Sequence, residues 1–180
     1  CACRGTAGFV HVSCLAEQAK ILCDEAWENN LDVKAKNKRW NRWHTCSLCE
    51  QRYHGVVESA LGWACWKTYV SRPETDQLLR LSMTQLGNGL SVPGHYEDAL
   101  SIREAELAIK KRLGLSQENI LITQNNLATS YACVGRLDEA SRLHQDVYSG
   151  RLELYGAENI HTVSSANNYA NTLIEMQRFK

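Results

Sequence analysis

Six cysteine and histidine side chains near the start of the chain have spacings that suit metal binding. In chain order they form C-x-C, H-x-x-C and C-x-x-C pairs, at Cys1, Cys3, His11, Cys14, Cys46 and Cys49. Thiolates and imidazoles paired in this way are ligands of tetrahedral zinc, because one turn of backbone aims two such side chains at one ion. The spacing indicates a structural site, in which four ligands leave no position open for water or substrate.

The residues around these ligands resemble the RING-CH (RING-variant) zinc finger. The matching segments are CACRGTAGFVHVSC at positions 1–14 and CSLCEQRYHG at positions 46–55. The chain departs from the family in the long span between these segments and in lacking the tryptophan that usually follows the H-x-x-C pair. The resemblance implies the last six of the eight ligands of a cross-brace, so we expect the start of the finger to lie upstream of residue 1.

A cross-brace would divide the ligands between two zinc ions. The resemblance implies one complete site, formed by Cys1, Cys3, Cys46 and Cys49. It implies half of a second site, formed by His11 and Cys14, whose partners are expected upstream. The alternative is that Cys1 and Cys3 are paired by chance and that only the C-x-x-C pair matters.

The overall composition argues against several classes of function. The 180 residues include 20 basic and 20 acidic side chains, so the net charge is zero and gives no general attraction to nucleic acid or anionic membranes. No apolar run is long enough to span a bilayer. Cysteines at metal-type spacing favour a reducing compartment, so we expect a cytoplasmic protein. The remaining cysteines, Cys23, Cys65 and Cys133, lie in apolar helical contexts and are expected to be inert core thiols.

The second half of the chain contains an internal repeat. NNLATSYACVGRLDEA at 125–140 aligns with NNYANTLIEMQRFK at 167–180 at an offset of 42 residues. LGNGLSVPGHYEDA at 86–99 aligns with 127–140 at an offset of 41 residues. Each unit is predicted to be helix, turn, helix, with Gly135 ending a first helix because glycine tolerates a left-handed cap. Ala140 then provides the small residue where two helices cross closely.

These units resemble tetratricopeptide repeats of the kinesin-light-chain type over residues 76–180. The third unit stops before its second helix, so the C-terminus is also expected to be cut. The resemblance implies an α-solenoid whose concave face binds an extended or helical peptide. The asparagines that recur on its first helices predict the contact residues, because an amide both donates and accepts hydrogen bonds. Asn126 and Asn168 are the candidates, and the alternative is that the first asparagine of each pair caps or packs between repeats.

Two segments connect these parts. Residues 56–75 have helical spacing up to Pro73 and are expected to form a buried connecting helix rather than an aromatic ligand surface. Residues 15–43 form an insertion between the zinc ligands, with a helical first part and then five basic residues interleaved with Trp40 and Trp43. Such a stretch can bind nucleic acid, but we expect a solvated loop with one tryptophan packed on the zinc core.

The sequence therefore predicts a mainly α protein, in which a small zinc-bound RING-like module at 1–55 and a connecting helix at 56–75 precede repeats at 76–180. No motif for side-chain catalysis is present. The predicted function is a zinc-binding adaptor for protein partners. The alternative is a RING-type ubiquitin ligase, in which the finger holds a ubiquitin-conjugating enzyme and the repeats select the substrate.

Overall fold

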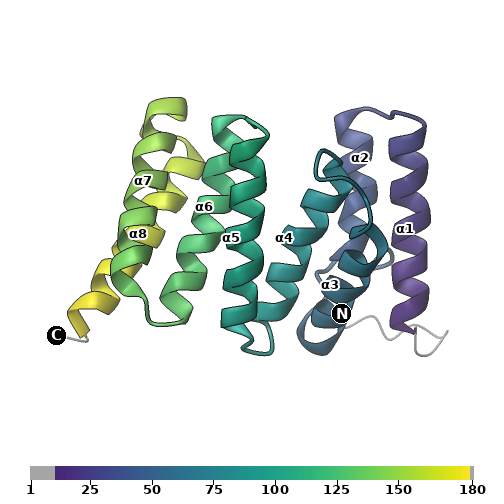
Figure 1. The fold of residues 1–180 in the computed structure, drawn as a ribbon, viewed down its shortest axis with the longest axis horizontal. Coiled ribbons are helices and arrows are strands. Elements are labelled where there is room, and N and C mark those ends of the chain that lie inside the picture. Colours follow the sequence, from purple (N-terminus) through teal and green to yellow (C-terminus); the bar gives the residue numbers. More distant parts are fainter. Residues whose placement is uncertain (1–10, 179–180) are drawn as a thin grey trace. The chain divides into compact units, whose positions relative to one another are not determined.

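The computed structural model describes residues 11–178, which divide into two compact units that meet between His95 and Tyr96. The first unit contains α1 (Val12–Glu28), α2 (Val33–Trp40), the short 3-10 helix η1 (Asn41–Trp43), α3 (Gly55–Tyr69) and α4 (Gln77–Ser91). The second contains α5 (Tyr96–Arg112), α6 (Gln117–Cys133), α7 (Leu137–Tyr155) and α8 (Ile160–Arg178). Figure 1 shows these helices in chain order. Within the described range, strand pairing is limited to one isolated bridge between Thr45 and Arg52.

The helices begin and end where local chemistry requires it. Asp32 and Asp76 accept hydrogen bonds from backbone amides in the first turns of α2 and α4, each at 2.7 Å. α6 ends as predicted at Gly135, whose φ of +79° closes the last turn without the strain that a Cβ atom would add. The amides of Gly135 and Arg136 then bond back to the carbonyls of Ala132 and Tyr131.

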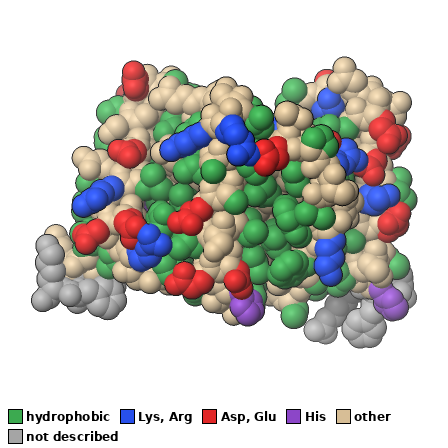
Figure 2. Space-filling model, viewed as in Figure 1, with side chains coloured by type: hydrophobic (Ala, Val, Ile, Leu, Met, Phe, Trp, Pro, Cys, Tyr) green, Lys and Arg blue, Asp and Glu red, His purple; other side chains and the backbone are tan. Residues whose placement is uncertain are grey.

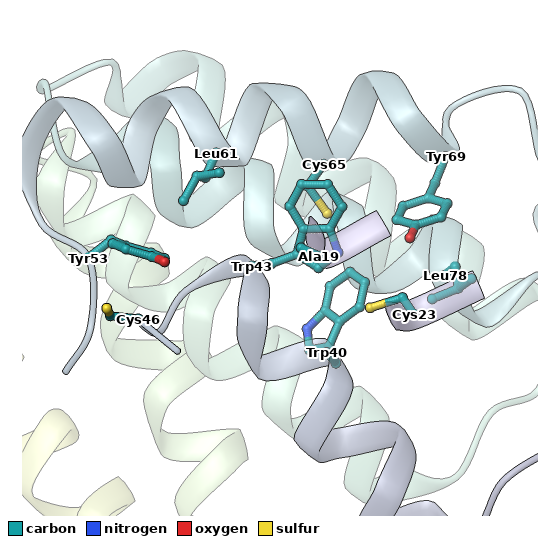
Figure 3. Close-up of a cluster of buried hydrophobic side chains, with 10 residues drawn as sticks. All are labelled: Ala19, Cys23, Trp40, Trp43, Cys46, Tyr53, Leu61, Cys65, Tyr69 and Leu78. Atoms are coloured by element: carbon teal, nitrogen blue, oxygen red, sulfur yellow. The ribbon is translucent and has the colours of Figure 1, made fainter. Parts of the chain in front are cut away.

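The core of the first unit is a cluster of aromatic, aliphatic and thiol side chains (Figure 3). Trp40, Trp43 and Tyr69 form a triangle with ring centroids 6.1–6.4 Å apart. Cys23 and Cys65 are fully buried in the same cluster, as predicted. Burial raises the pKa of Cys23 to about 12, so it remains a protonated thiol at neutral pH.

The prediction for the basic stretch was wrong. Residues 33–40 form α2 rather than a solvated loop, and both Trp40 and Trp43 are buried. The reason is the Asp32 cap together with an amphipathic pattern, which turns the tryptophans inward while the lysine chains reach water. The prediction that Cys133 is a core thiol was also wrong, because this residue lies exposed at the end of α6.

The predicted connecting helix is present as α3, and it packs closely against α4 at two glycines. A Cβ atom built on Gly62 would lie 3.2 Å from the Cα atom of Gly89 and 3.0 Å from the carbonyl oxygen of Gln85. This contact joins α4, the first helix of the first predicted repeat, to the compact unit that contains α1–α3. The predicted boundaries at residue 55, where the zinc module ends, and residue 75, where the connecting helix ends, stay predictions.

The second unit consists of antiparallel helices that are held together by apolar contacts and by a repeated set of buried polar contacts. Ala140 is fully buried where α7 crosses α6, as predicted. Between α5 and α6, Arg103 donates to Ser130 Oγ, and Lys110 donates to Thr123 Oγ1 at 2.7 Å. One repeat later, between α7 and α8, His144 and Arg151 contact Thr172 and Ser165 in the same way. We call these four contacts the hydroxyl ladder.

Candidate functional site

The asparagines of the repeats bring α6 and α8 together. Asn168 Nδ2 donates to Asn125 Oδ1 at 3.0 Å, which links the first helices of two successive repeats. The backbone carbonyl of Asn126 accepts a hydrogen bond from Arg103 at 3.0 Å, and its side chain is half-buried. Asn125, the first asparagine of the earlier pair, thus bonds between repeats, and so does Asn168, the second asparagine of the later pair. Peptide contact through Asn126 and Asn168 stays a prediction.

A cavity of about 230 Å³ lies beside this asparagine pair. Its walls come from α6, α7 and α8, and they include Thr129, Cys133, His144, Asn168, Asn171, Thr172 and Glu175. Most of these groups are neutral and polar, and Glu175 is exposed. We call this space the α6–α8 cavity. It can hold one polar side chain of a bound partner, in direct contact with the predicted residue Asn168.

The hydrogen bonds around His144 determine which of its ring nitrogens carries the proton. Thr172 donates its hydroxyl hydrogen to the carbonyl of Asn168 at 3.1 Å, so its oxygen accepts from His144 Nδ1 at 2.9 Å. Burial lowers the pKa of His144, which favours the neutral ring. His144 therefore carries its proton on Nδ1 and presents a lone pair at Nε2. No group in the described part of the chain donates to that buried nitrogen.

Stability of the second unit should therefore depend on pH through His144. The unfolded ring takes up a proton near pH 6.5, whereas the folded ring resists protonation because its pKa is lowered. The stability that neutral His144 provides is present above about pH 6.5 and is lost as the pH falls through the folded pKa. The free energy of unfolding of α5–α8, measured with urea, should decrease on acidification. It should decrease less in His144→Phe. An equal pH dependence in both proteins would contradict this assignment.

The residues of the α6–α8 cavity were missed at the sequence level, although the repeat alignment contained a signal for them. His144 aligns with Arg103, and Thr172 aligns with Ser130, so a polar pair recurs at one register of both helix interfaces. A hydroxyl that faces a basic side chain in successive repeats marks an interface, because buried polar groups need partners. Glu175 aligns with Cys133, so the later repeat has a carboxylate where the earlier repeat has a thiol.

The C-x-x-C pair lies in a tight turn between η1 and α3. The amide of Leu48 donates to Cys46 Sγ at 3.4 Å, and the amide of Glu50 donates to the Cys46 carbonyl at 3.1 Å. Glu50 adopts a φ of +56°, which allows the chain to reverse and place Arg52 opposite Thr45. Cys46 is buried and Cys49 is half-buried. The C-x-x-C pair thus lies in a turn that is ordered by two backbone hydrogen bonds to Cys46.

The other four predicted zinc ligands lie outside the described residues or at the start of α1. Cys1 and Cys3 lie outside the described residues. His11 precedes α1, and Cys14 is exposed in the first turn of that helix. Within residues 11–178, no three histidine, cysteine or acidic side chains are grouped as metal ligands. The four-cysteine site and the half site stay predictions.

Comparison with known proteins gives two findings on the repeats. Residues 120–161 match the family described as tetratricopeptide repeat. Among solved structures, the crystal structure of BtubC (BKLC) from P. vanneervenii matches with a TM-score of 0.60 and 16% sequence identity, over 93% of this chain and 68% of that chain. At this identity the likeness concerns the fold alone. No curated protein sequence matches significantly.

The described helices also bear on membrane insertion, since none of them is both long and apolar enough to cross a bilayer. Two kinds of observation indicate a helical-repeat fold for α5–α8. One is the hydroxyl ladder between the helices, and the other is the pair of similarities to known proteins. Residues 120–161 match a tetratricopeptide repeat, and the chain has a helical-repeat fold.

Proposed function

We propose that this protein is an adaptor whose repeats bind a peptide segment of a partner protein on the face where α6 and α8 lie side by side. The observation that carries the proposal is the amide pair between Asn168 and Asn125, with the α6–α8 cavity beside it. Asparagine amides can bond to both the carbonyl and the amide of a peptide backbone. This face thus provides backbone recognition and a neighbouring space for a side chain.

Charge supports a protein partner rather than a nucleic acid. Figure 2 shows acidic and basic side chains distributed over the visible face without a large region of one sign. Nucleic-acid affinity depends mainly on neutralised phosphates, which a chain with 20 basic and 20 acidic residues is poorly suited to provide. Recognition by hydrogen bonds and side-chain cavities does not need net charge.

Asn126→Ala combined with Asn168→Ala should weaken peptide binding about thirty-fold, because each of the two lost hydrogen bonds costs about 1 kcal/mol. A random peptide library selected on the full chain supplies the ligand, and isothermal titration measures its affinity. The matched control is Gln145→Ala with Ser149→Ala, two exposed polar positions on α7. The proposal fails if no peptide is selected. It also fails if the asparagine variant binds as well as the control while melting at the same temperature.

A second proposal concerns the zinc module, and it is favoured by the turn at Cys46 and Cys49. The amide of Leu48 donates to Cys46 Sγ, and the positive φ of Glu50 reverses the chain after Cys49, so both cysteines lie in one tight turn. Cys1 and Cys3 would complete the shell with Cys46 and Cys49. Zinc bound there would be structural and would stabilise the front of the chain. Zinc-bound thiolates persist in a reducing compartment, which is why we propose a cytoplasmic location.

Purified full chain should contain about one zinc ion at high affinity, and Cys46→Ser should lose it. Metal content is measured by mass spectrometry, and the exposed thiol variant Cys133→Ser serves as the control. Helical circular dichroism should fall only modestly, because helical repeats depend mainly on contacts with neighbouring repeats. Equal metal content in wild type and Cys46→Ser would contradict the site.

The ligase alternative adds a requirement to the zinc module. The finger would have to bind a ubiquitin-conjugating enzyme and speed the transfer of ubiquitin from its thioester to an amine. Discharge of ubiquitin from a panel of charged conjugating enzymes onto free lysine tests this, with Cys46→Ser as the inactive control. No acceleration by the wild-type chain would exclude the ligase role and leave the adaptor role standing.

A further inference from the structure

We propose that the α6–α8 cavity receives one basic side chain, lysine or arginine, from the bound partner. This inference rests on the proposed function and deepens it, because it states which residue of the partner peptide is read. A volume of about 230 Å³ holds a single long side chain and not a helix or an aromatic pair. The cavity adjoins Asn168, so a peptide backbone held there could place one side chain into it.

The charge of the lining favours a cation. Glu175 contributes a carboxylate, and among the described side chains that form the cavity walls none is a lysine or an arginine. The charge of Arg103 on α5 acts on Cys133, but Arg103 does not line the cavity. Its guanidinium donates to the carbonyl of Asn126 and to Ser130 Oγ. An acidic side chain would therefore meet Glu175 as a like charge.

The hydrogen-bonding capacity of the lining also favours a donor. His144 is 3% exposed, and its Nε2 lone pair has no donor among the described residues. Glu175 offers only acceptors, and Asn168 uses its amide nitrogen on Asn125. A lysine ammonium has three donors and no acceptor, and a guanidinium has five donors and no acceptor. Either group can donate to the carboxylate of Glu175, which lines the cavity.

The test begins with the peptides selected on the full chain. Their alignment should show lysine or arginine at one fixed position, and replacing that residue by norleucine should weaken binding. Glu175→Gln should weaken the basic peptide about five-fold and leave the norleucine peptide unchanged, because it removes only the partly exposed ion pair. Glu153→Gln on α7 is the matched control, since it removes an exposed carboxylate outside the cavity.

The outcomes separate this inference from the proposed function. Selected peptides without a basic position, or an enriched acidic position, would overturn the inference and leave peptide binding on α6 and α8 intact. If Glu175→Gln lowers the affinity for the basic and the norleucine peptides equally, the inference is also overturned. If no peptide is selected at all, both the inference and the proposed function are overturned.

Discussion

Replacing Trp43 by alanine should lower the free energy of unfolding of the first unit by about 3–5 kcal/mol, the range expected when a large buried aromatic side chain is deleted. Trp43 is fully buried and packs edge-on against Tyr69 with ring centroids 6.1 Å apart. It also lies 6.4 Å from Trp40, so its removal opens the centre of the aromatic triangle (Figure 3). Urea unfolding followed by far-ultraviolet circular dichroism measures the change.

Trp63→Ala provides the matched control, because it deletes the same side chain from α3, where it is 44% exposed. Nearly half of that indole already meets water, so its loss should cost less than the loss of Trp43. If the two variants are equally stable, the aromatic cluster is not the core of the first unit.

Replacing Lys110 by methionine should destabilise the second unit by about 3 kcal/mol, because removing one partner of a buried ion pair weakens the compensation of the Glu106 charge, on which Arg103 also acts. Lys110 Nζ lies 2.6 Å from Glu106 Oε1 and 2.7 Å from Thr123 Oγ1. The Glu106 side chain is 1% exposed, so water cannot replace the lost ammonium. The measurement is thermal or urea unfolding of α5–α8, with methionine chosen to preserve volume.

The neighbouring residue supplies the control for this prediction. Lys111 is on the same helix but exposed, so Lys111→Met should change stability by less than about 0.5 kcal/mol. The double variant Lys110→Met with Glu106→Leu should recover much of the loss, because apolar replacement of both partners removes the buried charge. Equal effects at positions 110 and 111 would show that the ion pair contributes nothing.

Periodicity made the repeats predictable from sequence. Gly135 and Ala140 have the conformation and burial that the alignment required, because a left-handed cap and a close helix crossing each restrict the residue types allowed. The α3 helix was predictable for a similar reason, since Pro73 and Asp76 set its end and the start of α4. These features are local, so a single sequence contains enough information to place them.

The features that were not predicted depend on contacts distant in sequence. Residues 33–43 appeared polar because five basic side chains outnumber the two tryptophans, yet burial of Trp40 and Trp43 against α3 fixes a helix at 33–40. Cys133 was expected in the core, but its register on α6 leaves it exposed at the α6–α8 cavity. The protonation of His144 follows from its contact with Thr172, which is 28 residues away and not visible in local pattern.

The location of the bound peptide tests the central claim of this account most directly. Hydrogen exchange of the full chain with and without a selected peptide can be measured segment by segment. With peptide bound, we expect slower exchange in α6 (Gln117–Cys133) and α8 (Ile160–Arg178), where Asn126 and Asn168 lie. This slowing should disappear in the Asn126→Ala, Asn168→Ala variant at the same peptide concentration. Protection confined to α7 or to the first unit would contradict binding on the α6 and α8 face.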